Sequence, residues 1–306
     1  VFLKRDDLSA ADYGGNKVRK LDFILADARD RGRKSVLAFG YAGSNFVAAT
    51  AWHGRKLGLR ALGALLPQAP ADYVVDNLSV SLAAGAELFL RGSEPALGLD
   101  AVLRATRATL RDGAAPVWIP PGGSNALGAL GFVNAACELK QQMDAGIMPA
   151  PQSLYLPFSS MGTVAGLAAG FQLLGMKPRI VAVQVVTARH ASQAKLQRLL
   201  RQLALLLARS GISVDAAAAL DAVELRTEFF GAEYARATPQ ALAAMQRFTA
   251  ATGARADAAY SGKGLACLYA DVAAGRLRRP ALYWHTLSFS RRPAQLARAA
   301  PQAVPP

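Results

Sequence analysis

The sequence predicts an α/β protein with two open, twisted parallel-sheet lobes covered by helices. Helical and strand-like patterns alternate along the 306 residues, and a hydrophobic content of 52% can supply a large core. Short apolar segments separated by stretches long enough for helices are typical of βαβ units, in which both faces of a parallel sheet are buried. The length suggests about two domains.

Each element follows from its local pattern. A first helix is expected over residues 16–31, because its apolar residues recur on one face: Val18, Leu21, Ile24, Leu25 and Ala28. Apolar runs predict one series of strands at residues 35–39, 59–66, 86–90 and 116–119. A second series is predicted at residues 153–156, 180–186 and 281–285. A leucine-rich packed helix is expected over residues 192–209, and the tail beyond Pro301 is expected to fray.

The clearest break in the pattern is Pro120-Pro121-Gly122-Gly123, which can mark the return of the chain from one lobe to the other. We expect a large domain formed by residues 1–30 plus 134–306 and a small domain formed by residues 31–133. Such a division places the loops that follow the strands at the functional edge of each sheet.

Composition narrows the class of protein. The formal charge is +14, but the arginines are scattered without a dense basic block or interleaved aromatics, so no specific nucleic acid partner is expected. No run of about 18 uncharged apolar residues predicts a membrane span, and the first residues do not resemble a signal peptide, so a cytoplasmic protein is expected. Cys137 and Cys267 are read as core thiols, and no histidine spacing indicates a metal site.

Lys17 is the candidate reactive amine. It lies between Gly14-Gly15 and the expected first helix, where the positive end of the helix dipole disfavours an ammonium ion. That field, together with partial burial, favours the neutral amine that can react with an aldehyde cofactor. A solvated lysine in an ordinary capping loop is the competing interpretation for this segment taken alone.

Loops after the expected strands carry the other candidates. Residues 40–46 form a glycine-bracketed turn that offers Ser44 and Asn45, although Ser44 can equally be a helix N-cap. Residues 120–128 form a second such turn. Residues 157–163 lead into a helix of small residues and offer hydroxyls and backbone amides, a suitable cradle for a phosphate. An amine, a phosphate cradle and a hydroxyl-amide turn together indicate pyridoxal 5'-phosphate.

Several short motifs of the chain resemble those of a known family. Its motifs, in order, are residues 4–8, 14–21, 43–45, 122–131, 162–167, 260–263 and 285–286. They are similar to the D-cysteine desulfhydrase and 1-aminocyclopropane-1-carboxylate deaminase family, which belongs to the tryptophan-synthase-like, fold type II pyridoxal phosphate enzymes. The resemblance implies a cofactor in the cleft between the two lobes, a small amino-acid substrate and a homodimer.

The same resemblance implies roles for individual residues. Lys17 matches the lysine that carries the cofactor, and Asn45 matches the partner of its ring hydroxyl. The phosphate loop corresponds to Ser159, Ser160, Met161, Gly162 and Thr163. Thr286 matches the partner of the pyridine nitrogen, and Ser44 and Tyr260 match hydroxyls that bind substrate or handle protons; Tyr260 can also be a tyrosine at the edge of the core.

The implied reaction is α,β-elimination from D-cysteine or a related β-substituted alanine, which yields pyruvate and ammonia, with sulfide from a thiol. In the deaminase branch a glutamate follows the tyrosine and a leucine follows the histidine; Ser261 and Thr286 therefore favour the desulfhydrase branch. Phe46, the Ser159 and Met161 replacements of loop glycines, and Leu287-Ser288 depart from the family pattern. If Met161 has positive φ, strain of about 1 to 3 kcal/mol follows.

Three alternatives stay open from the sequence. The chain can be a 1-aminocyclopropane-1-carboxylate deaminase, or a degenerate, non-catalytic paralogue that keeps the fold. It can also be a basic α/β protein that binds a polyanion. His53 and His190 are read as surface or capping residues, and His285 as a structural neighbour of Thr286.

Overall fold

The computed structural model describes residues 1–290, and contacts divide the chain into two compact units. Unit 1 comprises residues 1–9 and 125–287, and unit 2 comprises residues 10–124 together with the segment that begins at Ser288. One boundary falls between Ser124 and Asn125, directly after the Pro-Pro-Gly-Gly segment. The contacts place residues 10–30 in unit 2. The sequence analysis expected a large domain of residues 1–30 plus 134–306 and a small domain of residues 31–133. That expected division into domains stays a prediction.

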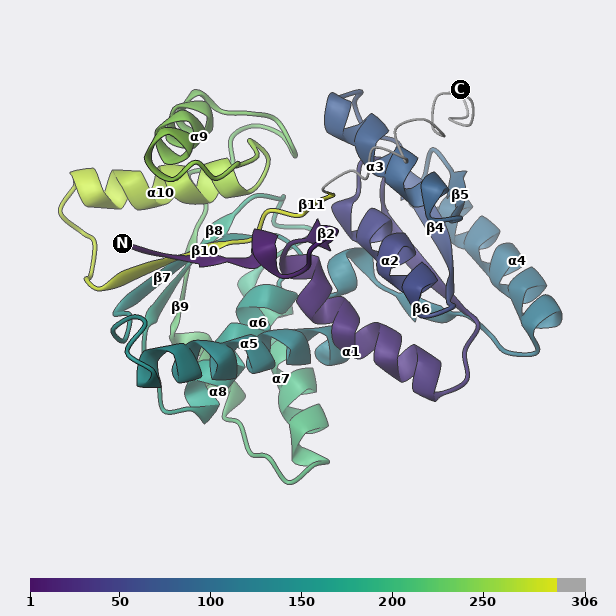
Figure 1. Ribbon diagram of the computed structural model, residues 1–306, viewed down its shortest axis with the longest axis horizontal. Helices are drawn as coiled ribbons and strands as arrows, with labels where there is room; N and C mark the ends of the chain where they lie inside the picture. Colours follow the sequence, from purple (N-terminus) through teal and green to yellow (C-terminus); the bar gives the residue numbers. More distant parts are fainter. Residues whose placement is uncertain (291–306) are drawn as a thin grey trace. The chain divides into compact units, whose positions relative to one another are not determined.

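Unit 1 is built on a five-stranded parallel sheet with the strand order β1-β10-β7-β8-β9. Its strands are β1 (Phe2–Arg5), β7 (Ser153–Phe158), β8 (Arg179–Gln184), β9 (Val223–Arg226) and β10 (Ala281–His285). Its helices are η1 (Asp6–Leu8), α5 (Ala126–Asp144), α6 (Gly162–Leu173), α7 (Gln193–Ala208), α8 (Ala216–Asp221), α9 (Pro239–Thr252) and α10 (Ser261–Ala273). These elements are labelled in Figure 1.

Unit 2 contains a four-stranded parallel sheet with the order β5-β4-β3-β6. Its strands are β3 (Ser35–Tyr41), β4 (Arg60–Leu66), β5 (Glu87–Leu90) and β6 (Val117–Ile119). Its helices are α1 (Asn16–Asp30), α2 (Asn45–Lys56), α3 (Asp72–Ala83), α4 (Glu94–Asp112) and η2 (Pro121–Gly123). A short antiparallel pair joins β2 (Tyr13–Gly14) to β11 (Phe289–Ser290).

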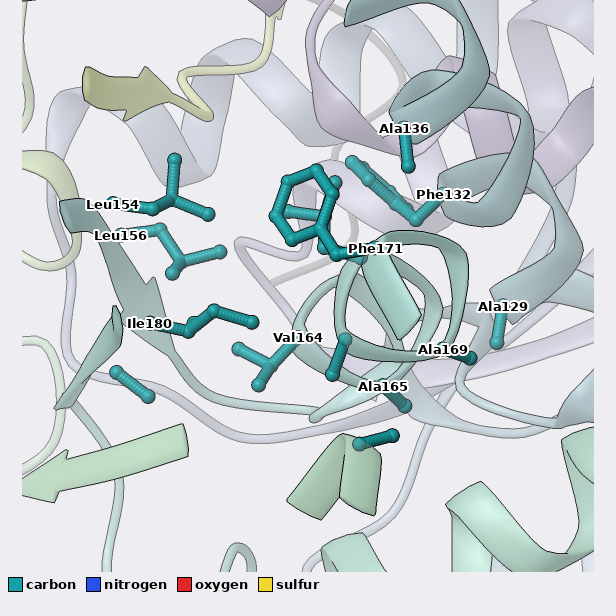
Figure 2. Close-up of a cluster of buried hydrophobic side chains, with 14 of the residues drawn as sticks. Ala129, Phe132, Ala136, Leu154, Leu156, Val164, Ala165, Ala169, Phe171 and Ile180 are labelled. Carbon is teal, nitrogen blue, oxygen red and sulfur yellow. The ribbon is translucent and has the colours of Figure 1, made fainter. Parts of the chain in front are cut away.

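The sheet of unit 1 is apolar on both faces because alternate residues of each strand point to opposite sides. On β7, Leu154 and Leu156 join the cluster that includes helices α5 to α8, whereas Tyr155 joins the cluster formed with α9 and α10. Figure 2 shows the first cluster, in which side chains of β7 and β8 pack against α5 and α6. The sheet is therefore covered on both faces, as the βαβ pattern predicts.

Helix α6 packs closely against α5 because two of its residues lack side chains. A Cβ atom on Gly166 would lie 2.2 Å from the Ala129 carbonyl oxygen, and one on Gly170 would lie 2.6 Å from the Ala136 Cβ. These separations are far below van der Waals contact, so each glycine permits the close approach of the two helices. The small-residue pattern of this segment thus has a packing role.

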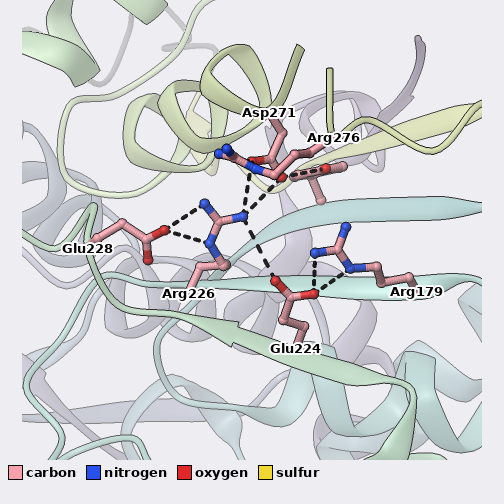
Figure 3. Close-up of polar contacts among 7 residues, drawn as sticks. Arg179, Glu224, Arg226, Glu228, Asp271 and Arg276 are labelled. Carbon is pink, nitrogen blue, oxygen red and sulfur yellow. Dashed lines mark hydrogen bonds and ion pairs between the residues drawn. The ribbon is translucent and has the colours of Figure 1, made fainter. Parts of the chain in front are cut away.

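An ion-pair network ties β9 to α10 (Figure 3). The buried carboxylate of Asp271 lies 3.0 Å from the Arg226 guanidinium and 2.9 Å from that of Arg276, and it accepts a hydrogen bond of 2.8 Å from Tyr155. Burial alone would raise the pKa of Asp271, but the bonds from Tyr155, Arg276 and Arg226 outweigh it and hold the pKa below its usual value. Arg226 also pairs with Glu228 at 2.6 Å.

The predicted α/β class and its parallel sheets are confirmed, with each expected strand within two residues of its observed ends. Strand β9 was missed because apolar and charged residues alternate along it, so it forms no apolar run. Its charged residues, Glu224 and Arg226, belong to the network in Figure 3. Cys267 is buried as expected, whereas Cys137 is only partly so. The expectation for the tail beyond Pro301 lies outside the described residues. No helix within residues 1–290 is long and apolar enough to cross a membrane.

Candidate active site

Lys17 is the second residue of α1, as predicted. Gly15 precedes the helix with a φ of 122°, a conformation that favours glycine, and the first turn contains no acidic residue. An acidic side chain in this first turn would favour a charged ammonium, and the turn has none. The side chain of Lys17 is partly exposed.

A second lysine, Lys20, follows Lys17 in α1. Lys20 is fully buried one turn later, and its Nζ donates hydrogen bonds of 3.0 Å to the Gly122 carbonyl and 3.0 Å to the Ser124 hydroxyl. Burial lowers the pKa of Lys20 well below its usual value, and the charge of Lys17 lowers it further.

The turn before Lys17 is held by the segment that departs from the family pattern. A Cβ atom on Gly15 would lie 2.4 Å from the Ser288 Cα, so this turn and Ser288 are in direct contact. The next residues form β11, which pairs Phe289 with Gly14. The Leu287-Ser288 replacement thus affects the packing of the lysine-bearing turn.

Ser44 and Asn45 lie at the start of α2, after the carboxyl end of β3. The Ser44 hydroxyl accepts a bond of 3.3 Å from the Val47 amide, so the N-cap interpretation of Ser44 is correct for this structure. Asn77 was missed by the sequence analysis: it donates 2.9 Å bonds to both the Gly43 carbonyl and the Asn45 Oδ1. Since that oxygen accepts from Asn77, the NH₂ group of Asn45 remains to donate to a ligand oxygen.

Phe46, which departs from the family pattern, is part of the core. Its ring is only 2% exposed. A Cβ atom on Gly123 would lie 2.7 Å from the Phe46 ring, so the ring packs directly against η2. Within unit 2 it therefore supports the glycine turn after β6.

Residues 159–163 connect β7 to α6. Met161 has a φ of 70° and a ψ of −27°, so the positive φ considered from the sequence is confirmed. The Gly162 amide donates to the Ser160 carbonyl at 2.9 Å, and α6 begins at Gly162 without an acidic residue in its first turn. A helix N-terminus without acidic residues in its first turn favours an anion.

Tyr260 immediately precedes α10, and Asp257 fixes its backbone. The Asp257 carboxylate accepts bonds of 2.6 Å from the Tyr260 amide and 2.6 Å from the Ser261 hydroxyl. Ser261 is fully buried and its hydroxyl is used inside this turn. The Tyr260 hydroxyl forms a hydrogen bond with the Tyr234 hydroxyl, a residue that the sequence analysis missed.

Thr286 follows β10 directly and is buried. The preceding His285 lies in an aromatic setting, with ring centroids 5.2 Å from Phe248 and 6.2 Å from Tyr283. Burial lowers the pKa of His285, and neither ring nitrogen has a hydrogen-bond partner of ordinary geometry. A neutral, structural imidazole beside Thr286 fits these observations.

The structure brings the candidates together within each unit. In unit 1, residues 159–163 and Thr286 follow β7 and β10, which are neighbours in the parallel sheet, so they share its carboxyl edge. In unit 2, the Tyr13 hydroxyl donates 3.2 Å to the Asn45 carbonyl and links the strand before Lys17 to the start of α2. His53 contacts the Tyr13 carbonyl at 3.0 Å, and residues 1–290 contain no metal-binding cluster of His, Cys, Asp and Glu.

The chain from residue 1 to 286 matches the family described as pyridoxal-phosphate dependent enzyme. The protein belongs to this family. The match spans the lysine turn, the strand-end loops and Thr286, so the cofactor of this family member is pyridoxal phosphate. The resemblance inferred from the motifs is thereby confirmed.

Individual relatives are similar over nearly the whole chain. A nocardicin C-9' epimerase from Nocardia uniformis subsp. tsuyamanensis is 34% identical, covering 94% of this chain and 85% of the relative. A D-cysteine desulfhydrase from Serratia proteamaculans is 33% identical, covering 94% of this chain and 86% of the relative. A crystal structure of an ACC deaminase homologue superposes with a TM-score of 0.80 and 29% identity, covering 93% of this chain and 83% of that one.

The residues present fit the cofactor in chemical type. Lys17 offers an amine at the start of a helix, Asn45 an NH₂ donor, and Thr286 a hydroxyl at a strand end. The Met161 turn opens onto a helix N-terminus, which suits a phosphate. Which of these groups contacts the cofactor stays a prediction.

Proposed function

We propose that the protein is a pyridoxal-phosphate-dependent lyase that removes ammonia from a small amino acid by α,β-elimination. The favoured substrate is D-cysteine or a related β-substituted alanine. With D-cysteine, one water is consumed and pyruvate, ammonia and sulfide are released. The single observation that carries the proposal is Lys17 in the first turn of α1, after a glycine turn and with no acidic residue in that first turn, in a family member that uses this cofactor.

Each proposed residue has a distinct task. When bound, the cofactor supplies an electron sink that stabilises negative charge at the substrate α-carbon. Lys17 holds the cofactor and then takes the α-proton as a general base. Asn45 donates its NH₂ group to the cofactor's ring oxygen, residues 159–163 hold its phosphate, and Thr286 meets its ring nitrogen.

The hydroxyl groups handle protons and the substrate. The Tyr234–Tyr260 hydrogen bond allows one hydroxyl to stabilise charge on the other, which suits proton delivery to a departing thiolate or to a carbon. Ser44 caps α2 through its oxygen, and its hydroxyl proton remains to bind the substrate.

The test is product analysis with the cofactor-loaded protein. D-cysteine should give equal amounts of pyruvate and sulfide, and Lys17→Ala should lower the rate by about a thousandfold or more and abolish covalent capture of the cofactor by borohydride. Lys34→Ala, at an exposed lysine of unit 2, is the matched control and should keep both. A protein that holds the cofactor but turns over no substrate in a panel including L-cysteine, D-serine and 1-aminocyclopropane-1-carboxylate would support the non-catalytic alternative.

A second candidate function is epimerisation at the α-carbon, favoured by the 34% identity to the nocardicin C-9' epimerase. A base on one face of the α-carbon and an acid on the other are sufficient for this reaction. Incubation with D-alanine, which has no leaving group, in deuterated water distinguishes it. Inversion with deuterium uptake would favour epimerisation, and pyruvate from D-cysteine without inversion of D-alanine favours elimination.

We also propose that the protein acts in the cytoplasm as a homodimer without a specific nucleic acid partner. The resemblance to the desulfhydrase and deaminase family supports the dimer, and the scattered arginines support the last point. Light scattering should give a mass of about twice the 32.1 kDa of one chain. Any retention on DNA should vanish at moderate salt without sequence preference.

A further inference from the structure

Lys263 is a fully buried lysine on α10, three residues after Tyr260. Its Nζ donates a 2.6 Å hydrogen bond to the Phe230 carbonyl and lies 5.2 Å from the centroid of the Phe230 ring. Burying an ammonium ion is costly unless a partner compensates it, whereas leucine or methionine would fill the same space without that cost. The contact with Phe230 therefore calls for an explanation beyond packing.

Phe230 belongs to the irregular segment between β9 and Thr238, the N-cap of α9; it comprises residues 227–237. The Phe230 amide donates a 3.2 Å hydrogen bond to the Thr227 carbonyl. A Cβ atom on Gly231 would lie 2.8 Å from the Thr238 methyl carbon, so these two residues are in close contact. Ala235 has a φ of 61°, a left-handed conformation that is strained for a residue with a side chain. The conformation of this segment therefore has to be imposed by contacts with its surroundings.

The segment has two contacts with the start of α10. Tyr260 is the residue before α10 and Lys263 is the third residue of the helix, so both lie at the same end of α10. Lys263 bonds the segment at Phe230, and four residues later the Tyr234 hydroxyl meets that of Tyr260. Asp257 meanwhile fixes the backbone of Tyr260, the other partner of the tyrosine pair.

We propose that Lys263 is a positioning residue that anchors residues 227–237 to α10 and so places the Tyr234 hydroxyl against Tyr260. Lys263 itself touches neither substrate nor cofactor in this proposal. Its effect on turnover rests on the proposed function of the tyrosine pair. The anchoring does not, and it can be measured without any substrate.

The first experiment measures anchoring by amide hydrogen exchange in the cofactor-loaded protein. Lys263→Met keeps the apolar stem and removes the donor, and Lys177→Met, at an exposed lysine of unit 1, is the matched control. We expect exchange within residues 227–237 to accelerate by about tenfold or more in Lys263→Met only, with residues 153–173 unchanged. Unchanged exchange in residues 227–237 would overturn the proposal, whatever reaction the protein catalyses.

The second experiment is a double-mutant cycle on turnover with the substrate that wild type accepts. Lys263→Met and Tyr234→Phe should each lower kcat by about tenfold while changing KM less, and the double variant should be no slower than the worse single one. Effects on kcat that multiply would show that Lys263 acts independently of Tyr234 and would overturn the proposed route. If wild type accepts no substrate, the proposed function fails and the exchange experiment still decides the anchoring.

A folding defect is distinguished by a second variant. Lys263→Gln keeps a donor on a shorter side chain and should lie between wild type and Lys263→Met in the exchange rate of residues 227–237. If Lys263→Met does not fold, Lys263→Gln carries the same comparison against Lys177→Met. A purely structural lysine would lower the melting temperature without a selective change in this segment, and that result counts against the proposal.

Discussion

Met161 offers a measurable test of backbone strain at the proposed phosphate loop. It adopts a φ of 70°, a left-handed conformation, while its partly buried side chain packs against the large core cluster of unit 1. For residues other than glycine this conformation costs about 1 to 2 kcal/mol. Within a helix or strand, replacing alanine by glycine lowers the free energy of unfolding by about 0.5 to 1 kcal/mol, because glycine makes the unfolded chain more flexible.

Comparison of Met161→Gly with Met161→Ala isolates the strain, because both variants lose the side-chain packing. The alanine keeps the unfavourable φ and the glycine does not, so glycine should be more stable by about 0.5 to 1 kcal/mol, the strain less the flexibility term. Ala243→Gly, at an exposed position in α9, is the control and should be destabilised by about 1 kcal/mol. The sign of the alanine-to-glycine change should therefore reverse between the two sites.

The assay is equilibrium urea denaturation of the cofactor-free variants, with the slope of the transition compared so that free energies are evaluated consistently. If Met161→Ala is as stable as Met161→Gly while the α9 control behaves as expected, the strain argument is wrong. Cofactor affinity gives a further check. If the loop holds the same conformation with and without cofactor, strain cancels and the two variants should bind it within about threefold of each other.

Other expected outcomes concern single contacts. Asn77→Ala should lower cofactor affinity by about tenfold, since it leaves Asn45 without its orienting donor, and equilibrium titration measures this. Asp271→Asn should lower the free energy of unfolding by about 3 kcal/mol at pH 7. Because the pKa of Asp271 is lowered in the folded protein, the stabilisation from this carboxylate is present above about pH 4 and is lost as the pH falls through the folded pKa. The stabilities of the variant and of wild type should therefore converge in acid denaturation. Burial raises the pKa of the Cys267 thiol to about 12. Iodoacetamide at neutral pH should therefore label Cys137 alone in the native protein and both cysteines after unfolding. Labelling of Cys267 in the native protein would contradict its burial.

Apolar runs predicted the parallel strands because a strand that is buried on both faces consists almost entirely of apolar residues. The same rule could not find β9, in which Glu224 and Arg226 belong to an ion-pair network formed with distant elements. Lys17 could be placed at a helix start because the glycine turn and the apolar periodicity adjoin it. The positive φ at Met161 was foreseen because it replaces a glycine in the family pattern.

The missed site residues share a physical reason. Asn77, Lys20 and Tyr234 act through contacts with residues 32, 102 and 26 positions away in the chain, so no local pattern identifies them. Buried lysines such as Lys20 and Lys263 also contradict the usual exposure of charged side chains. Only the tertiary structure supplies their carbonyl partners.

Strand β2, just before Lys17, pairs with β11, although some 270 residues separate them in the chain and the intervening polypeptide contains all but nine residues of unit 1. During synthesis, residues 10–124 leave the ribosome long before residues 288–290 exist. The turn that carries the reactive lysine therefore acquires its last backbone partner near the end of translation. An N-terminal fragment that stops before β11 should fold its four-stranded sheet yet leave this turn incompletely braced.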